Sequence, residues 1–411
     1  MPKANEWRAG WPVVTASLVG MMVSAWTLPF YLLGPLTLPL MEQFGWSKSG
    51  LALSASALSI GATIGAALFG RVSDRIEVRK VALISLAAFG FSLLLAPMIS
   101  ALWQLQLLYF TAGLLGAGCG GIAYMRAIGS RFQAARGVAL AVALSGTGLA
   151  AFAVPLVAYT INAVFGWKGV FVLLGAVIIL VGLPAIYWGL GATPKGAGQP
   201  ERPKEAAETG MTRAEAMRDP RFYLIMGMVI LFGLFISALI INLVPILQAQ
   251  GLTAARAAAI ASSMGLAMII GRLGVGWLLD RWPPSLVGAG TFAVGAIGSL
   301  LLALAGAEYA LLTVISMGLL VGAEVDLLSF IVLRYFGVRN YGEIYGWLYG
   351  AYTLVSMAGP PFGALLLEQG GYRLLFGSAS ASFGLAMLLF VILAHVAGEV
   401  PGVRKAGKAQ I

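Results

Sequence analysis

The chain has 411 residues, of which 60% are hydrophobic and 10% are charged, and its formal net charge is +10. Soluble domains carry roughly 45–50% apolar and about 25% charged residues, so lipid is the solvent that fits this chain. A single cysteine, Cys119, and a single histidine, His395, exclude an intrachain disulfide and a cysteine metal site and argue against a histidine-based catalytic site.

Twelve apolar runs are each long enough to cross a membrane, which takes about 20 mostly apolar residues. The predicted spans are 11–37, 50–70, 81–102, 105–128, 137–162, 168–191, 222–248, 257–279, 284–305, 309–333, 344–367 and 373–397. We therefore expect an all-α membrane protein whose two ends lie on the same side of the bilayer.

Lysine and arginine residues indicate which side that is. Of the 26, all but six lie at the two ends of the chain or in loops on the same side as these ends. The exceptions are Lys48, Lys168, Arg256 and Arg373 on the opposite side, and Arg126 and Arg272 inside spans. The positive-inside rule predicts cytoplasmic termini. Because the basic residues are spread along loops that flank the membrane, we expect no nucleic-acid partner.

The loop between spans six and seven is the longest, and its Gly/Pro-rich, charged composition is typical of a flexible linker. It divides the chain into an N-terminal six-helix half (1–192), a cytoplasmic linker (193–219) and a C-terminal six-helix half (220–411).

Three motifs recur in the two halves at an offset of roughly 205 residues, which indicates an internal duplication. They are Gly70–Arg75 with Gly276–Arg281, Arg131–Arg136 with Arg334–Arg339, and Gly166–Phe171 with Gly371–Phe376. Duplicated halves are typical of transporters whose parallel repeats are related by a pseudo-two-fold axis along the membrane normal, with the binding site near the midplane.

The first motif suggests a conformational latch made by Gly70, Asp74 and Arg75, with Asp280 and Arg281 in the second half. An Asp can cap a helix end and pair with Arg, and the glycine allows close helix approach. The alternative is that these residues are only turns and cytoplasmic anchors.

Twelve spans, a six-plus-six division and paired Gly-x-x-x-Asp-Arg loops resemble the major facilitator superfamily over the whole chain. Gly10–Val14, Arg131–Ala139 and Gly271–Leu273 are similar to motifs of its monocarboxylate transporter and oxalate–formate antiporter branch. Three departures are the missing acid and first Trp of the first motif, Met268 where some members have an acid, and no second cation in span eleven. The resemblance implies alternating access around a cavity lined by spans four and ten, with Arg272 as the substrate-binding arginine.

Two arginines lie at membrane depth, where a charged side chain is costly. Arg272 is eight residues before Asp280, roughly 12 Å inside the helix end. Its planar guanidinium matches a carboxylate bidentately, so we predict a substrate ligand, the alternative being a structural ion pair or a side chain that reaches the interface. Arg126 lies roughly 8 Å inside its span and is either a cavity charge or structural.

Glu324 and Asp326 lie mid-span in the tenth run and point to nearly opposite helix faces. At the repeat offset Asp326 corresponds to Ala123, which shares a face with Arg126. We therefore hypothesise that Asp326 faces Arg126 across the pathway. Either acid is a candidate for proton coupling, because a desolvated carboxyl can bind a proton near neutral pH; the alternative is a buried structural group.

Further substrate-binding candidates are polar or aromatic side chains within spans, which can donate hydrogen bonds to a carboxylate. They are Tyr31, Tyr124, Asn242, Tyr349 and Tyr352.

The predicted function is secondary active transport of small, monocarboxylate-like organic anions, driven by proton symport. The alternatives are anion exchange, including dicarboxylates, and efflux of a lipophilic or cationic compound. A membrane receptor and a membrane enzyme fit less well, because the central loop is short and catalytic residues are scarce. We expect no cofactor and no metal, a proton and an organic anion as partners, and a monomer in the bacterial inner membrane.

Overall fold

The computed structural model describes residues 3–73, 77–119, 121–129, 131–132, 135–190, 210–337 and 339–399. These residues are helical, apart from turns and one isolated bridge between Gly210 and Gly337. The α-helices are α1 (Lys3–Met22), α2 (Thr27–Phe44), α3 (Lys48–Ser73), α4 (Val78–Leu95), α5 (Leu102–Gly116), α6 (Gly121–Gly129), α7 (Arg136–Val177), α8 (Leu183–Gly189), α9 (Arg213–Ala216), α10 (Pro220–Ala249), α11 (Ala254–Leu279), α12 (Pro284–Ala305), α13 (Ala310–Phe336) and α14 (Tyr341–Val396).

The membrane crossings do not correspond one to one with these helices. Some helices contain two crossings, and some crossings are made of two helices. Within the described residues, eight apolar stretches are suited to span a membrane, and three of them are 53 or 56 residues long, enough for two crossings each. Each long stretch turns at a glycine with positive φ: Gly166 (φ 67°), Gly306 (φ 70°) and Gly371 (φ 65°). Only glycine adopts this conformation without strain. Because three of the eight stretches cross twice, the eight stretches together with α3 make the twelve crossings expected from the sequence.

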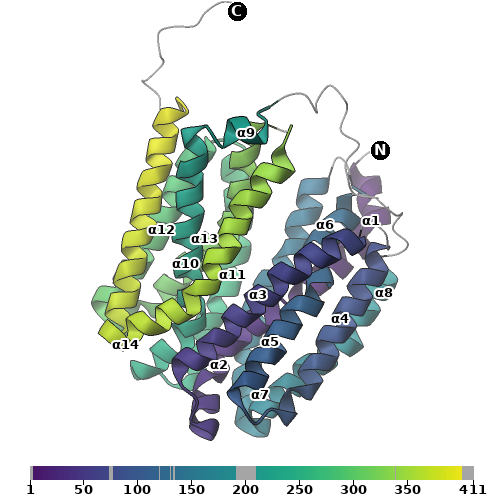
Figure 1. The fold of residues 1–411 in the computed structure, drawn as a ribbon, viewed down its shortest axis with the longest axis vertical. Coiled ribbons are helices and arrows are strands. Elements are labelled where there is room, and N and C mark those ends of the chain that lie inside the picture. The colour runs from purple at the N-terminus through teal and green to yellow at the C-terminus, as the bar shows by residue number, and fades with distance from the viewer. Residues whose placement is uncertain are drawn as a thin grey trace, which may run out of the picture.

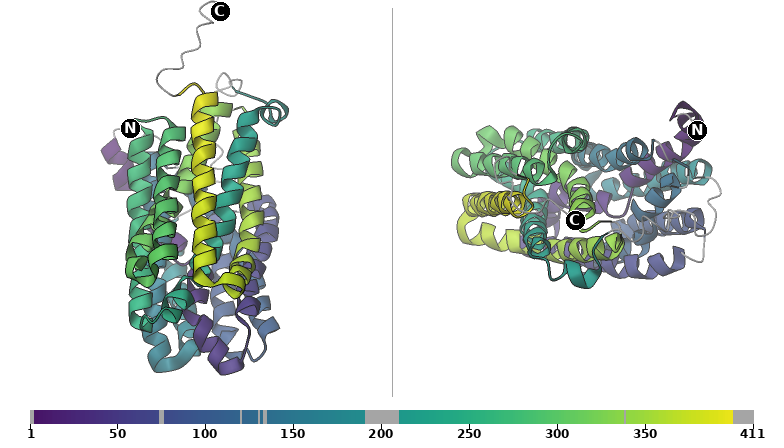
Figure 2. Two further views of the ribbon diagram at one scale, coloured as in Figure 1. Left: turned by 90° about the vertical axis from the view of Figure 1, so that its left-hand side faces the viewer. Right: turned by 90° about the horizontal axis from the view of Figure 1, so that it is seen from above.

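Short breaks interrupt two crossings. The first crossing consists of α1 and α2, separated by a turn at residues 23–26, and the fourth consists of α5 and α6, joined by the 3-10 segment Ala117–Cys119. The helices run along the long axis of the molecule, as Figure 2 shows.

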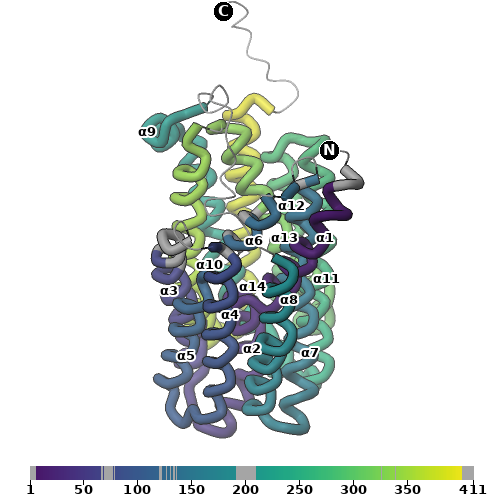
Figure 3. Tube along the Cα trace, turned by 90° about the vertical axis from the view of Figure 1, so that its right-hand side faces the viewer, coloured from purple at the N-terminus to yellow at the C-terminus, as the bar shows by residue number. Residues whose placement is uncertain are grey.

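The apolar core divides into two clusters, each drawn from one half of the chain except that Ala151 joins the cluster of the second half and Ile241 that of the first. Figure 1 shows the halves side by side, with purple and blue helices in the first and teal to yellow helices in the second. The start of α1 and the end of α14 lie at the same end of the bundle, which we call the terminal side. α9 falls within the predicted linker, lies at this end (Figure 3), and forms an ion pair with α14 from Arg213 to Glu343 at 3.3 Å.

The close contacts between the halves lie toward the far side, opposite the terminal side. The Ser56 hydroxyl of α3 donates to the Met357 carbonyl of α14 at 2.5 Å. Where α7 meets α11, a Cβ added at Gly265 would lie 2.2 Å from the carbonyl oxygen of Gly148. Toward the terminal side, the ribbons of the two halves diverge (Figure 1). Among the residues that the structure describes, the halves therefore approach each other most closely toward the far side.

Equivalent glycines bring equivalent helices together in the two halves. A Cβ at Gly113 of α5 would lie 2.1 Å from the carbonyl oxygen of Leu58 in α3, and one at Gly318 of α13 would lie 2.5 Å from that of Met264 in α11. These pairs are related by the offset of the sequence repeat, so the duplication extends to helix packing.

Candidate functional site

The candidate site is built on the close packing of α11 against α13. A Cβ at Gly322 would lie 2.2 Å from the Met268 carbonyl oxygen, and one at Gly271 would lie 2.6 Å from that of Leu319. Small residues allow this approach. Met264 with Gly318 and Met268 with Gly322 are both 54 residues apart and follow each other by one helical turn, so the two helices run parallel and in constant register.

One turn further, the same register pairs Arg272 with Asp326. Arg272 Nε lies 3.3 Å from Asp326 Oδ2, and the side chains are 8% and 27% exposed. The contact is an ion pair, since Arg272 Nε makes no hydrogen bond of good geometry to any residue that the structure describes. A partner of opposite charge reduces the cost of a charged side chain at this depth, yet the unsatisfied N–H remains able to bind an acceptor.

This pairing was not predicted. From the sequence we expected Asp326 to face Arg126, whose backbone lies in α6 but whose side chain is outside the described residues. The sequence did contain a signal for this pairing. Asp326 lies eight residues before Arg334, and Arg272 lies eight residues before Asp280, so the two side chains are expected at equal depth. Parallel spans with charges at equal depth can pair them.

The first half adds Tyr31, from α2, to this site. Its hydroxyl donates to Met268 Sδ at 3.3 Å, one turn before Arg272. The site therefore has walls from both halves, as alternating access around a midplane site requires.

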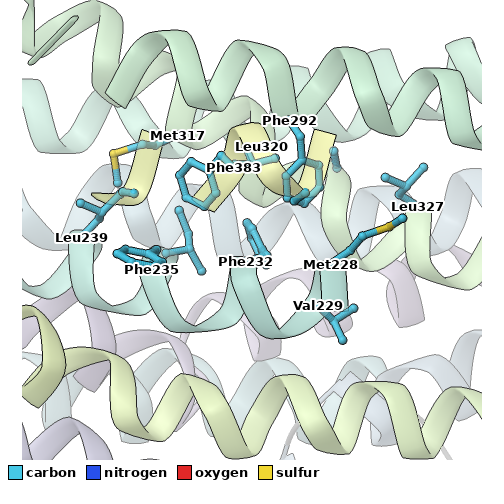
Figure 4. Packing of buried hydrophobic residues seen from close by; sticks show 14 of the residues in the cluster. Met228, Val229, Phe232, Phe235, Leu239, Phe292, Met317, Leu320, Leu327 and Phe383 are labelled. Carbon is cyan, nitrogen blue, oxygen red and sulfur yellow. The ribbon is translucent and has the colours of Figure 1, made fainter. Parts of the chain in front are cut away.

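Glu324 occupies a different environment from Asp326. It is 7% exposed, its Oε1 has no hydrogen-bond partner among the described residues, and it lines a small cavity with Met228, Phe232 and Phe292. These three apolar side chains belong to the core of the second half, shown in Figure 4. The two acids thus point in different directions, as their spacing predicted.

A line of four tyrosines on α14 was only partly anticipated. Tyr341, Tyr345, Tyr349 and Tyr352 follow one another at ring-centroid distances of 5.7, 5.6 and 5.5 Å. Spacings of four, four and three residues place them on one helix face. The Tyr341 and Ser329 hydroxyls share a hydrogen bond of 2.8 Å, so this face is turned toward α13. Tyr341 and Tyr345 were not predicted, although the spacing is visible in the sequence.

Two other predicted ligands lie in packed surroundings. Asn242 is 2% exposed, and its Nδ2 donates to the Ala238 carbonyl at 2.8 Å. Tyr124 is buried against Gly20 in the first half, and its hydroxyl has no partner among described residues. Their roles as substrate ligands stay predictions.

The predicted latch is described only in part. Gly70 lies in the last turn of α3, while Asp74 and Arg75 fall outside the described residues. In the second half, Asp280 ends α11. Arg281 Nη1 donates to the Trp277 carbonyl at 3.0 Å, and its guanidinium lies 4.0 Å from the ring centroid of Trp277. The latch remains a hypothesis.

Another residue that the prediction missed is Glu6 of α1. It is 8% exposed, and its Oε2 accepts from the Ala135 backbone N–H at 3.0 Å, just before α7 begins. A carboxylate at a helix N-terminus satisfies a free donor and complements the helix dipole. Glu6 thereby ties the first crossing to the fifth.

Comparison with known proteins identifies relatives that match most of the chain. Residues 13–328 match the profile of the Major Facilitator Superfamily. The sequence is 26% identical to a gallate transporter of Pseudomonas putida over 86% of this chain and 82% of that protein. It is also 26% identical to monocarboxylate transporter 11 of Mus musculus over 82% of this chain and 77% of that protein.

Solved structures share the fold at low sequence identity. A mutant of a nucleoside transporter superposes with a TM-score of 0.73 at 14% identity, covering 93% of this chain and 99% of that one. A D-xylose–proton symporter gives 0.70 at 15%, covering 92% and 97%. A human organic anion transporter gives 0.66 at 18%, covering 93% and 99%.

Proposed function

This chain belongs to the Major Facilitator Superfamily, and on that premise we propose that it is a proton-coupled transporter of small organic anions. It is a multi-pass membrane transporter, not an enzyme. The compounds named for the two relatives, gallate and monocarboxylates, are carboxylates, the anions that an arginine binds best.

The observation that carries the proposal is the Arg272–Asp326 ion pair. Arg272 is 8% exposed and Asp326 is 27% exposed, so the acid is the member of the pair that an incoming anion can replace. A carboxylate that takes the place of Asp326 keeps the guanidinium neutralised and forms the charge-assisted hydrogen bonds that Nε lacks.

Displacement of Asp326 supplies the coupling to protons. A carboxylate that loses its cationic partner inside a protein binds a proton more favourably than one that keeps it. Anion binding and protonation of Asp326 therefore promote each other, and reciprocal linkage is the thermodynamic requirement for symport. Asp326 contacts Arg272 directly, so we assign the coupled proton to it rather than to Glu324.

Orientation and assembly follow from the sequence and the shape of the site. The positive-inside rule supports our proposal that the terminal side, toward which the halves diverge (Figure 1), lies on the cytoplasmic face of a plasma membrane. One chain supplies both walls of the site, so we propose a monomer as the transporting unit.

The test is uptake of labelled small carboxylates into proteoliposomes, with and without an inward proton gradient. We expect gradient-driven uptake that Arg272→Ala abolishes and that Arg256→Ala retains. Arg256 is the matched control because it lies on the same helix but is exposed at the opposite end. Uptake that needs internal anion and ignores the gradient would overturn symport in favour of exchange. Failure to transport any carboxylate would overturn the anion assignment.

A further inference from the structure

Binding a carboxylate group does not require the tyrosine line on α14, which consists of Tyr341, Tyr345, Tyr349 and Tyr352. We infer that it makes the transporter selective for aromatic carboxylates, whose ring packs against these tyrosines while the carboxylate binds Arg272. This inference rests on the proposed anion transport and adds to it the class of anion.

The contacts of the line show that it faces the protein interior rather than lipid. At one end, Tyr341 hydrogen-bonds to Ser329 of α13. At the other end, Tyr352 stacks on Phe232 of α10, with ring centroids 5.9 Å apart and planes 18° apart. The tyrosines between them therefore follow the inner face of α14.

One end of the line also approaches the helix face that carries Asp326. Tyr341 hydrogen-bonds to Ser329, which lies one turn from Asp326 on the same face of α13. From the first half, the Tyr31 hydroxyl contacts Met268, one turn from Arg272. The line therefore approaches the face of α13 that carries Asp326, and Tyr31 approaches Arg272 from the first half. A planar ring attached to a carboxylate at Arg272 would extend toward these aromatic side chains.

Tyr349 is the member most open to such a ring. It is 38% exposed although its helix face is turned inward. Its ring is parallel within 11° to that of Tyr345 and tilted by 37° to that of Tyr352. Its hydroxyl makes no hydrogen bond to any residue in the described part of the chain. Aromatic contacts contribute beyond the area they bury, enough for roughly 2- to 12-fold in affinity per pair.

The experiment compares benzoate with cyclohexanecarboxylate, which has the same carboxylate and ring size but no π electrons. Equilibrium binding to the detergent-solubilised protein, at a pH where both are anions, avoids passive leakage of the acids. We expect benzoate to bind about 2- to 12-fold more tightly. Tyr349→Leu should lose this preference, while Tyr349→Phe should keep it because the ring remains.

Tyr309→Leu is the matched control, since Tyr309 is equally exposed, at 37%, but lies before α13 at the far side. It should keep the preference. Equal affinities in the native protein, or a preference that survives Tyr349→Leu, would overturn the inference. The proposed function would remain intact if both acids still bound in an Arg272-dependent way. Binding of neither acid, together with no carboxylate uptake in proteoliposomes, would overturn both.

Discussion

Replacing Gly322 with alanine tests whether close helix packing holds the charge pair together. The added Cβ would lie 2.2 Å from the carbonyl oxygen of Met268, and the next neighbours, at 2.9 and 3.0 Å, are also backbone atoms of Met268. Backbone cannot rotate away, so α13 must move about 1.2 Å to restore an ordinary contact of 3.4 Å. Added to the present 3.3 Å between Arg272 Nε and Asp326 Oδ2, that shift breaks the ion pair.

Overpacking of this kind costs about 1–3 kcal/mol in the free energy of unfolding. For a six-helix half that corresponds to a melting temperature lower by about 2–12 °C. The assay is thermal unfolding in detergent, combined with carboxylate uptake, which we expect to fall. Gly274→Ala is the control, since a Cβ there meets nothing within 4 Å and gains helix propensity. If Gly322→Ala melts at or above the temperature of this control, the packing argument is wrong.

Three further predictions concern binding, gating and acid stability. Arg272→Lys replaces a fork with a point charge and should weaken carboxylate binding about tenfold or more, measured by titration; unchanged affinity would contradict bidentate binding. Gly265→Val places side-chain atoms against the backbone of Gly148, so uptake should fall because the far side cannot close; normal uptake would show that this contact is dispensable. Arg221 hydrogen-bonds to Asp219 and lowers its pKa, so this carboxylate stabilises the fold above its unfolded pKa, and the contribution disappears as pH falls through the folded value. Asp219→Asn should therefore lose less stability than the native protein between neutral and strongly acidic pH, and equal losses would contradict this.

The crossings were predictable because they depend on local properties of the chain. The expected turn between spans five and six contains Gly166, and the one between spans eleven and twelve contains Gly370 and Gly371, the non-helical residues of α7 and α14. Apolar length and glycine conformation decide such features without knowledge of neighbouring helices.

The site was predictable in its members more than in its pairing. Arg272 stood out because a buried guanidinium needs a partner. The sequence repeat related Asp326 to the face of Arg126, because symmetry relates equivalent helices but does not determine which helices touch. The contact of α11 with α13 depends on glycines such as Gly318 and Gly322 meeting backbone across the interface. Polar residues such as Asn242 can also bond to their own helix, which composition does not reveal.

The central claim is that a bound carboxylate replaces Asp326 at Arg272 and that Asp326 then takes up a proton. The most direct measurement is proton uptake on benzoate binding, followed with a pH indicator in weakly buffered detergent solution. The account predicts close to one proton per anion for the native protein and for Glu324→Gln, and none for Asp326→Asn, which should still bind benzoate. Undiminished proton uptake by Asp326→Asn, or anion binding without proton uptake in the native protein, would contradict the account.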